Sequence, residues 1–182
     1  PTLAEGTLVS AEHWRRQFPA IPGIALPREA SDLSAIDWGP DAERGILREP
    51  PRIDASQHYA VLVPDVDRDG NEVAGVRAPM VAAPLATYTG WNLRARGFGH
   101  GAMHEFSGST IPFADSPEER AQTGDPRPAV AERYPDRDAY VAAITAAASA
   151  LCRAGLLLAE DVTRAEAAAA NWHAPRHDVK LP

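Results

Sequence analysis

The sequence contains a single cysteine, Cys152. One thiol cannot form an internal disulfide, and it cannot build a metal site made of thiolates. No run of about 18 apolar residues occurs, so we expect no membrane-spanning helix and no membrane partner. The net charge of −7 and the absence of any lysine or arginine run argue against nucleic acid as a partner.

The opening segment PTLAEGTLVS also lacks two features, the charged start and the apolar core of a signal peptide. It begins with Pro1 instead of methionine, which indicates a chain trimmed from a longer one. The cellular compartment therefore stays open.

What the sequence contains is typical of a globular protein, with 45% hydrophobic and 24% charged residues in 182 positions. We expect one unit of the α+β class. Its consecutive parts are an extended proline-rich arm over 1–57, a β-hairpin and a long aromatic and glycine-rich loop over 58–114, helices over 115–172, and a loose tail over 173–182.

The arm has many prolines and few periodic runs. Its segment SAEHWRRQFP predicts a short helix capped by Ser10. The later segment IDWGPDAERGILREPPRI predicts a connector with few strands, in which Trp38 and Ile46 are apolar anchors. An arm without its own core needs a surface to lie on.

Three aspartates alternate in VPDVDRDGNEVAGVR, and a glycine follows them: Asp65, Asp67, Asp69 and Gly70. A calcium loop begins this way, but it needs a bidentate carboxylate at its twelfth position, where this sequence has Val76. The β-rich runs on both sides and the turn residues DGN favour a β-hairpin over about 58–78 instead.

The stretch 78–114 is rich in glycine and aromatic residues and lacks periodicity, which is typical of a long loop that carries binding residues. Its segment TYTGWN mixes flat apolar area with hydroxyl and amide groups, as ligand pockets do. The candidate substrate-binding residues are Tyr88, Thr89, Trp91 and Asn92. The alternative is that Tyr88 and Trp91 fill the core beneath a turn, because most buried aromatic residues serve packing.

The C-terminal third predicts helices. DSPEERAQTG has Ser116 as a cap and Gly124 as a stop. AEDVTRAEAAAANW places Glu160 and Asp161 at the start of a last helix, and Pro175 ends any helical pattern after it.

Between these two segments, DRDAYVAAITAAASALCRAG predicts an amphipathic helix with Asp136 or Asp138 at its positive end. The apolar stripe consists of Tyr140, Ile144, Ala148 and Leu151/Cys152. On this stripe Cys152 is a small buried hydrophobe and not a nucleophile.

No motif predicts a catalytic residue, a cofactor or a metal. No serine lies in Gly-x-Ser-x-Gly, and the nearest match, FSGST, is expected to be a loop. No phosphate-binding glycine loop is present. Two histidine pairs, His100 with His104 and His173 with His177, have the spacing of zinc proteases but lack the intervening glutamate, and glycine or proline interrupts the helix. We expect surface or loop histidines.

The sequence resembles a known family through long blocks in a fixed order. The blocks are FPAIPGIALP, IDWGPDAERGILREPP, YAVLVPDVDRDGNEVAGVRAP, APLATYTGWNLR and GSTIPFADSPEERAQTGDPRPAVAERYPDRDAYVAAITAAASALCRAGLLLAEDV. They are similar to the C-terminal part of a large bacterial family called α/β hydrolase domain-containing proteins, over roughly residues 1–172. In that family the nucleophile serine and the histidine near the end of the hydrolase core lie upstream of the part matched here.

The resemblance implies that this chain is an appendage to an α/β hydrolase core, with the catalytic machinery in the upstream part of the same polypeptide. The reaction implied is serine-dependent hydrolysis of a small ester-like molecule. The HGAMH stretch looks peculiar to this sequence, so no family role transfers to His100 or His104.

Two hypotheses of different classes follow. The first is the C-terminal region of a serine hydrolase, which is inactive alone and lines the entrance to the core through residues 87–113. The second is a non-catalytic module that uses Tyr88, Trp91 and Asn92 to bind a small ligand or a partner protein. Metal chemistry through the histidines is a third alternative with the least support.

Overall fold

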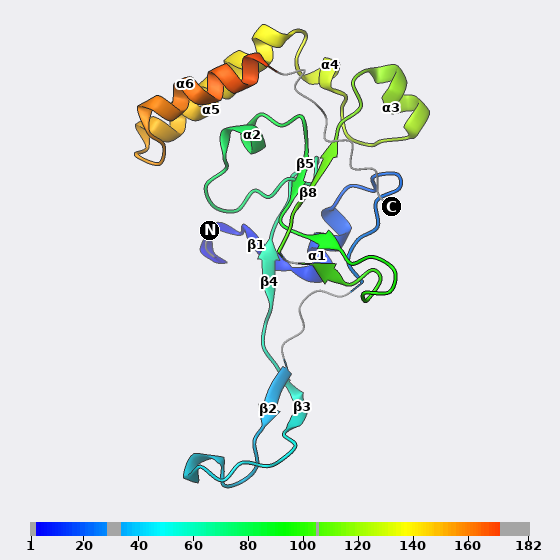
Figure 1. The fold of residues 1–182 in the computed structure, drawn as a ribbon, viewed down its shortest axis with the longest axis vertical. Helices are drawn as coiled ribbons and strands as arrows, with labels where there is room; N and C mark the ends of the chain where they lie inside the picture. The colour runs from blue at the N-terminus through cyan, green and yellow to red at the C-terminus, as the bar shows by residue number, and fades with distance from the viewer. Residues whose placement is uncertain (1–2, 29–33, 105, 172–182) are drawn as a thin grey trace.

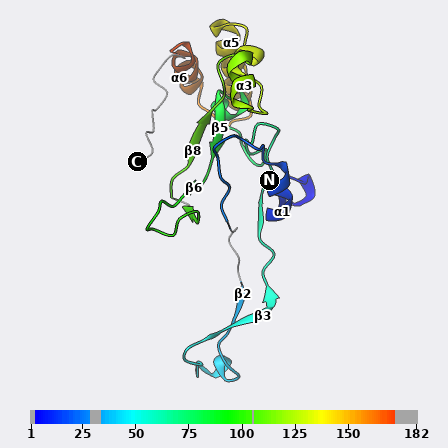
Figure 2. The ribbon, with the colours of Figure 1, turned by 90° about the vertical axis from the view of Figure 1, so that its right-hand side faces the viewer.

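The computed structural model describes residues 3–28, 34–104 and 106–171, and it has the mixed α+β character expected from the sequence. Figure 1 shows an elongated molecule in which a central body lies between two extensions. A two-stranded ribbon projects from one end of the body, and a pair of long helices lies at the other end (Figures 1 and 2).

All the described strands pair antiparallel and in twos. Isolated two-stranded ladders are marginal in water, so packing against neighbouring segments is needed to hold them. The pairs are β1 (Leu8–Ser10) with β4 (Leu62–Pro64), β2 (Ser34–Asp37) with β3 (Arg52–His58), β5 (Ala86–Thr89) with β8 (Ser109–Pro112), and β6 (Asn92–Leu93) with β7 (Met103–His104).

The projecting ribbon is formed by β2 and β3, with a 3-10 helix, Ala42–Arg44, in the loop between them. We call residues 34–60 the arm from here on. The predicted connector over 36–53 has few strand residues, because only its first two and last two residues belong to β2 and β3. The pairing of these two strands was not predicted, because the long loop between them leaves no short-range hairpin signal. Ile36 and Ile53 face each other in the register, and they are 49% and 73% exposed.

Residues 8–27, which the sequence assigned to the same extended region, pack on the body. Helix α1 (Ala11–Gln17) begins at Ser10, whose Oγ accepts a hydrogen bond from the His13 N–H at 3.2 Å. Phe18 and Ile21 follow the helix and are buried in one of the two apolar clusters of the body. The segment 8–27 therefore differs from the arm in that its apolar side chains Phe18 and Ile21 are buried.

The predicted hairpin over 58–78 is present only at its turn. The Asp67 N–H donates to the Asn71 carbonyl at 2.8 Å, and Gly70 has a φ of 81°, which glycine adopts without steric cost. The chain then returns only as far as an isolated bridge between Val66 and Glu72. The long ladder does not form because the strand before the turn, β4, bonds to β1 instead.

The stretch 78–114 is not the aperiodic loop that the sequence indicated, because it contains α2 (Pro79–Ala82) and the four strands β5 to β8. These strands are two to four residues long. Thr89 pairs with Ser109, far along the chain. Strands so short, with partners so distant, produce no periodic pattern in the sequence.

Helix α3 (Pro117–Thr123) confirms its predicted ends. The Ser116 Oγ accepts a hydrogen bond from the Glu119 N–H at 3.2 Å, and Gly124 closes the helix with a φ of 73°. A further turn of helix, α4 (Val130–Arg133), follows.

Helices α5 (Arg137–Arg153) and α6 (Ala159–Ala170) pack side by side at the end of the body opposite the arm (Figures 1 and 2). Asp136 caps α5 by accepting a hydrogen bond from the Ala139 N–H at 2.8 Å, while Glu160 and Asp161 lie in the first turn of α6. None of the helices in the described ranges is long and apolar enough to cross a membrane.

The predicted apolar stripe of α5 is buried at Tyr140, Ile144 and Ala148. It packs in the second apolar cluster of the body. Cys152 is half-buried at the end of this stripe. The predicted tail, with His173, Pro175 and His177, lies outside the described residues.

Candidate functional site

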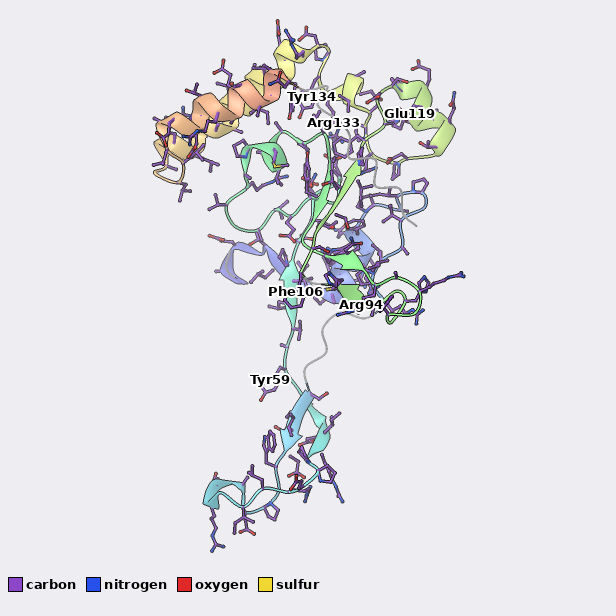
Figure 3. The ribbon with its side chains drawn as sticks, viewed as in Figure 1. Tyr59, Arg94, Phe106, Glu119, Arg133 and Tyr134 are labelled. Carbon is purple, nitrogen blue, oxygen red and sulfur yellow. The ribbon has the colours of Figure 1, made fainter. Side chains whose placement is uncertain are left out.

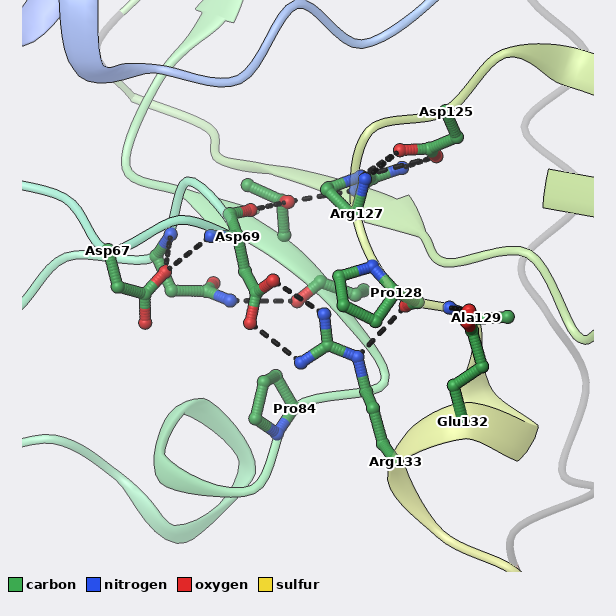
Figure 4. Close-up of polar contacts among 12 residues, drawn as sticks. Asp67, Asp69, Pro84, Asp125, Arg127, Pro128, Ala129, Glu132 and Arg133 are labelled. Carbon is green, nitrogen blue, oxygen red and sulfur yellow. Dashed lines mark hydrogen bonds and ion pairs between the residues drawn. The ribbon is translucent and has the colours of Figure 1, made fainter. Parts of the chain in front are cut away.

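A cluster of charged residues joins the 65–72 turn to α4 (Figure 4). Arg133 donates to the two carboxylate oxygens of Asp69 at 2.7 and 2.5 Å, and its Nε–H donates to the Pro128 carbonyl at 3.0 Å. The guanidinium also lies 4.0 Å from the centre of the Phe113 ring. A buried, bidentate and stacked arginine of this kind fixes geometry, so the pair acts as a clamp.

Arg127 makes the second half of this cluster and is almost fully buried. It donates to the carboxylate of Asp125, to the Thr87 Oγ1 at 2.8 Å, and to the carbonyls of Ile111 and Pro112 at 2.9 and 3.0 Å. Burial would raise the pKa of Asp125, but the hydrogen bonds from Arg127 outweigh it and lower this pKa. Because all five N–H donors of Arg127 are used, its role is structural.

The three alternating aspartates have separate partners. Asp67 Oδ1 accepts hydrogen bonds from the N–H groups of Asp69 and Asn71, both at 3.0 Å, and its Oδ2 pairs with Arg77 at 2.8 Å. Asp65 Oδ1 accepts from the Val66 N–H at 2.9 Å. The stretch that begins like a calcium loop is therefore a turn whose carboxylates bind arginines and backbone amides.

Tyr88, the first candidate binding residue, is a half-buried residue of β5. Its pKa is raised by burial, which a hydrogen bond with the Leu85 backbone partly offsets. Burial and the nearby Tyr88 and Tyr134 raise the pKa of Tyr140 to about 12. The rings of Tyr134 and Tyr140 pack edge to face, 5.2 Å apart. Tyr88 thus belongs to a tyrosine cluster with a packing role.

Thr89 and Trp91 are also held by the fold. The Thr89 hydroxyl donates to the Trp91 carbonyl at 2.6 Å and accepts from the Ser109 N–H at 3.1 Å. The Trp91 ring contacts the rings of Trp14 and Phe18, at centroid distances of 5.9 and 6.0 Å. These contacts support the alternative that this aromatic residue fills the core.

Asn92 is the candidate residue that remains exposed, at the edge of an open hollow of about 290 Å3 on the β6–β7 hairpin. The lining includes Asn92, Leu93, Arg94, Phe98, His104 and Ser107. The structure thus separates the four candidates. Tyr88 is half-buried and Thr89 is buried in β5, Trp91 packs in the aromatic cluster, and only Asn92 lines the surface hollow.

Ser107 and His104 meet at this hollow, with His104 Nδ1 at 3.1 Å from Ser107 Oγ. A nucleophile and a base are therefore in contact in this chain. In a serine hydrolase the base faces the serine through Nε2 and uses Nδ1 to bind the orienting acid. Here the serine occupies Nδ1, and the two residues lie three positions apart in an exposed turn. The contact is that of a local turn.

Within the described residues, no three His, Cys, Asp or Glu side chains gather as metal ligands. His100 and His104 lie on the β6–β7 hairpin and not on a helix. The sequence reasoning missed Arg94, Phe98 and Ser107. The sequence does contain a signal for Arg94. Residues 73–104 include no aspartate or glutamate, although the chain has 25 such residues.

Comparison with known proteins gives one positive result. The model of a family described as alpha/beta hydrolase domain matches residues 32–167. No curated protein and no solved structure matches the chain. The match covers the arm, both pairs of body strands from β5 to β8, and most of the helical region.

Proposed function

The chain belongs to the alpha/beta hydrolase domain family, and from this membership we propose that it is the C-terminal part of a serine hydrolase that acts on an ester-like substrate. In this proposal the 182 residues pack on the catalytic core, which precedes them in the same polypeptide. They shape the surroundings of the reaction and supply neither nucleophile nor general base.

The observation that carries the proposal is the apolar surface of the arm. Six large hydrophobic side chains on it are exposed: Ile36, Trp38, Ile46, Leu47, Ile53 and Tyr59. They lie on the arm, which projects from the body in both views (Figures 1 and 2). Figure 3 labels Tyr59 at the point where the arm joins the body. Several large apolar side chains exposed on one projecting ribbon favour an interaction site.

The pairing of the strands supports the same conclusion. A nucleophile elbow places its serine between a strand of a hydrolase sheet and a helix. The described strands form only two-stranded antiparallel ladders. Strand β1 runs directly into α1 through Ser10, but this serine has Leu8 and Glu12 where an elbow has glycines, and its hydroxyl caps the helix. A complete reaction centre needs a nucleophile, a base and an orienting acid in mutual contact.

The position of the β6–β7 hairpin suggests where the substrate would pass. This hairpin lies at the end of the body from which the arm projects (Figures 1 and 2). A core held by the arm would therefore lie close to the hairpin. Residues 87–113 would then line its entrance, as the sequence predicted.

The test is an ester-hydrolysis assay with p-nitrophenyl acetate on the 182-residue chain and on its Ser107→Ala variant. We expect both to hydrolyse the ester no faster than the buffer does. The coding sequence upstream of Pro1 should encode a Gly-x-Ser-x-Gly turn followed by a histidine, and the longer polypeptide should be active. Turnover by the short chain that disappears in Ser107→Ala would overturn the proposal.

The second candidate is a non-catalytic binding module, and the hollow beside Asn92 is the observation that favours it. The two candidates differ in what the arm does. A self-standing module would remain monomeric and unchanged when its arm residues are made polar. The hydrolase part would lose its association with the core.

A further inference from the structure

The hollow on the β6–β7 hairpin has a charge opposite to that of the whole chain. The net charge of the protein is −7, yet the segment 92–107, from which the lining residues come, carries two arginines, Arg94 and Arg96, and a single carboxylate, Glu105. Arg28 lies beside the same loop, where its backbone N–H donates to the Gly101 carbonyl at 3.2 Å. A Cβ at Gly101 would lie 2.9 Å from the Arg28 Nε, so the glycine lets this guanidinium pack against the loop.

Arg94 differs from the arginines of the buried cluster because its charge is not used within the described structure. Its backbone is fixed by hydrogen bonds with Ala102 and Gly101, at 2.9 and 3.1 Å. Its guanidinium forms no ion pair with any described carboxylate. An exposed guanidinium on a fixed backbone retains its N–H donors for an incoming ligand.

The other residues of the hollow supply the remaining parts of a site. The Asn92 Oδ1 accepts from the Leu93 N–H at 2.7 Å, which leaves the Nδ2 group as a donor. The Ser107 hydroxyl lies beside His104. Phe98 is 75% exposed and lines the same hollow, so apolar area adjoins the polar groups. Polar donors next to an aromatic surface are the composition of a small-ligand site.

We propose that this hollow binds a small organic anion, with a carboxylate or phosphate group on Arg94 and an attached apolar group against Phe98 and Leu93. A guanidinium group binds a carboxylate or a phosphate through paired N–H donors. The main requirement for a ligand of this hollow is therefore a negative charge. The hollow needs no catalytic core for this binding. Its test therefore gives the same answer whether or not the hydrolase proposal holds.

The experiment is an NMR titration of the 15N-labelled 182-residue chain at constant ionic strength. The probes are benzoate and phenyl phosphate, which distinguish the two anions, and benzyl alcohol as the neutral control. We expect saturable shifts of the amides in 92–107 with at least one anion and none with the alcohol. No saturable shift with either anion, or equal shifts with the alcohol, would overturn the proposal.

The matched variants are Arg94→Ala and Arg96→Ala, which remove the same charge from the same loop, and only Arg94 lines the hollow. Arg94→Ala should weaken anion binding about tenfold, whereas Arg96→Ala should change it less than about twofold. Arg94→Lys keeps the charge and serves as a second variant if the alanine variant disturbs the hairpin in its own spectrum. Equal weakening by both alanine variants would show diffuse surface attraction and would also contradict the proposed site.

Discussion

Asp69 and Arg133 lie 64 residues apart in the sequence and meet through two hydrogen bonds, of 2.5 and 2.7 Å. Neither side chain is more than about a tenth exposed. The pair attaches the turn of the 65–72 segment to α4, and it does so against the face of Phe113. It is one of the contacts that fix the helical end of the molecule to the strands, together with the hydrogen bond from the Val130 N–H to the Ala114 carbonyl.

The Arg133→Ala variant should lose about 3 kcal/mol of unfolding free energy, because it leaves the Asp69 carboxylate buried without its partner. Urea denaturation followed by circular dichroism measures the loss. The control is Arg137→Ala, whose ion pair with Asp138 is exposed on both sides, and which should lose less than about 0.5 kcal/mol. Equal losses in the two variants would contradict the clamp.

The Gly70→Ala variant should destabilise the protein by about 2 kcal/mol or more, for two reasons. The residue has a φ of 81°, and a Cβ there would lie 3.0 Å from Thr87 Cγ2 and 3.1 Å from Phe18 Cε2. Gly155→Ala is the matched control, since Gly155 has a φ of 74° but nothing within 4 Å of its Cβ position. It should lose only about 1 kcal/mol in the same denaturation experiment. A smaller loss at Gly70 than at Gly155 would show that the turn is not packed as described.

Stability should fall in alkaline solution as the pH rises through the interval between about 10 and 12. The pKa of Tyr140 is near 12 in the folded protein, above the ordinary value of 10.0, because burial disfavours the phenolate. The unfolded chain therefore loses this proton first as the pH rises, so the stabilisation is complete below pH 10 and is lost by pH 12. Burial raises the pKa values of Tyr88 and Tyr134 in the same direction.

Absorbance of the phenolate and urea denaturation at several pH values measure this effect. Tyr140→Phe removes one titrating group and should make the alkaline loss smaller. An alkaline loss unchanged in this variant would assign the effect to other groups.

Ile144→Ala should destabilise the chain by about 2 to 5 kcal/mol, whereas Ile53→Ala should change its stability by less than about 0.5 kcal/mol. The two substitutions are chemically identical, but Ile144 is 3% exposed in the second apolar cluster and Ile53 is 73% exposed on the arm. In the longer polypeptide, Ile53→Ala should instead weaken the attachment of this part to the catalytic core. Limited proteolysis of the longer polypeptide measures that attachment. A large loss of stability in the isolated chain at Ile53 would show that the arm already has a partner within it.

The sequence by itself determined where α1, α3 and α5 begin and which stripe of α5 is buried. Ser10, Ser116 and Asp136 cap helices through contacts three residues along the chain, and the stripe follows the helical repeat, so both depend on near neighbours only. It also determined the glycine turn at Gly70, since a positive φ is a property of that position. The resemblance to the hydrolase family could also be recognised from the sequence, because it consists of blocks of residues in a fixed order.

The tertiary structure alone decided which strands pair, which charges are buried and which candidate residue stays accessible. Tyr88, Thr89 and Trp91 were predicted as a site together with Asn92, and pairing of β5 with β8 and packing on α1 left only Asn92 exposed. Arg94 and Arg127 are the same residue type, yet one faces solvent and the other is closed in by Asp125 and Thr87. The reason is physical: burial and pairing depend on segments that are distant in the chain, and their positions are fixed only when the whole chain has folded.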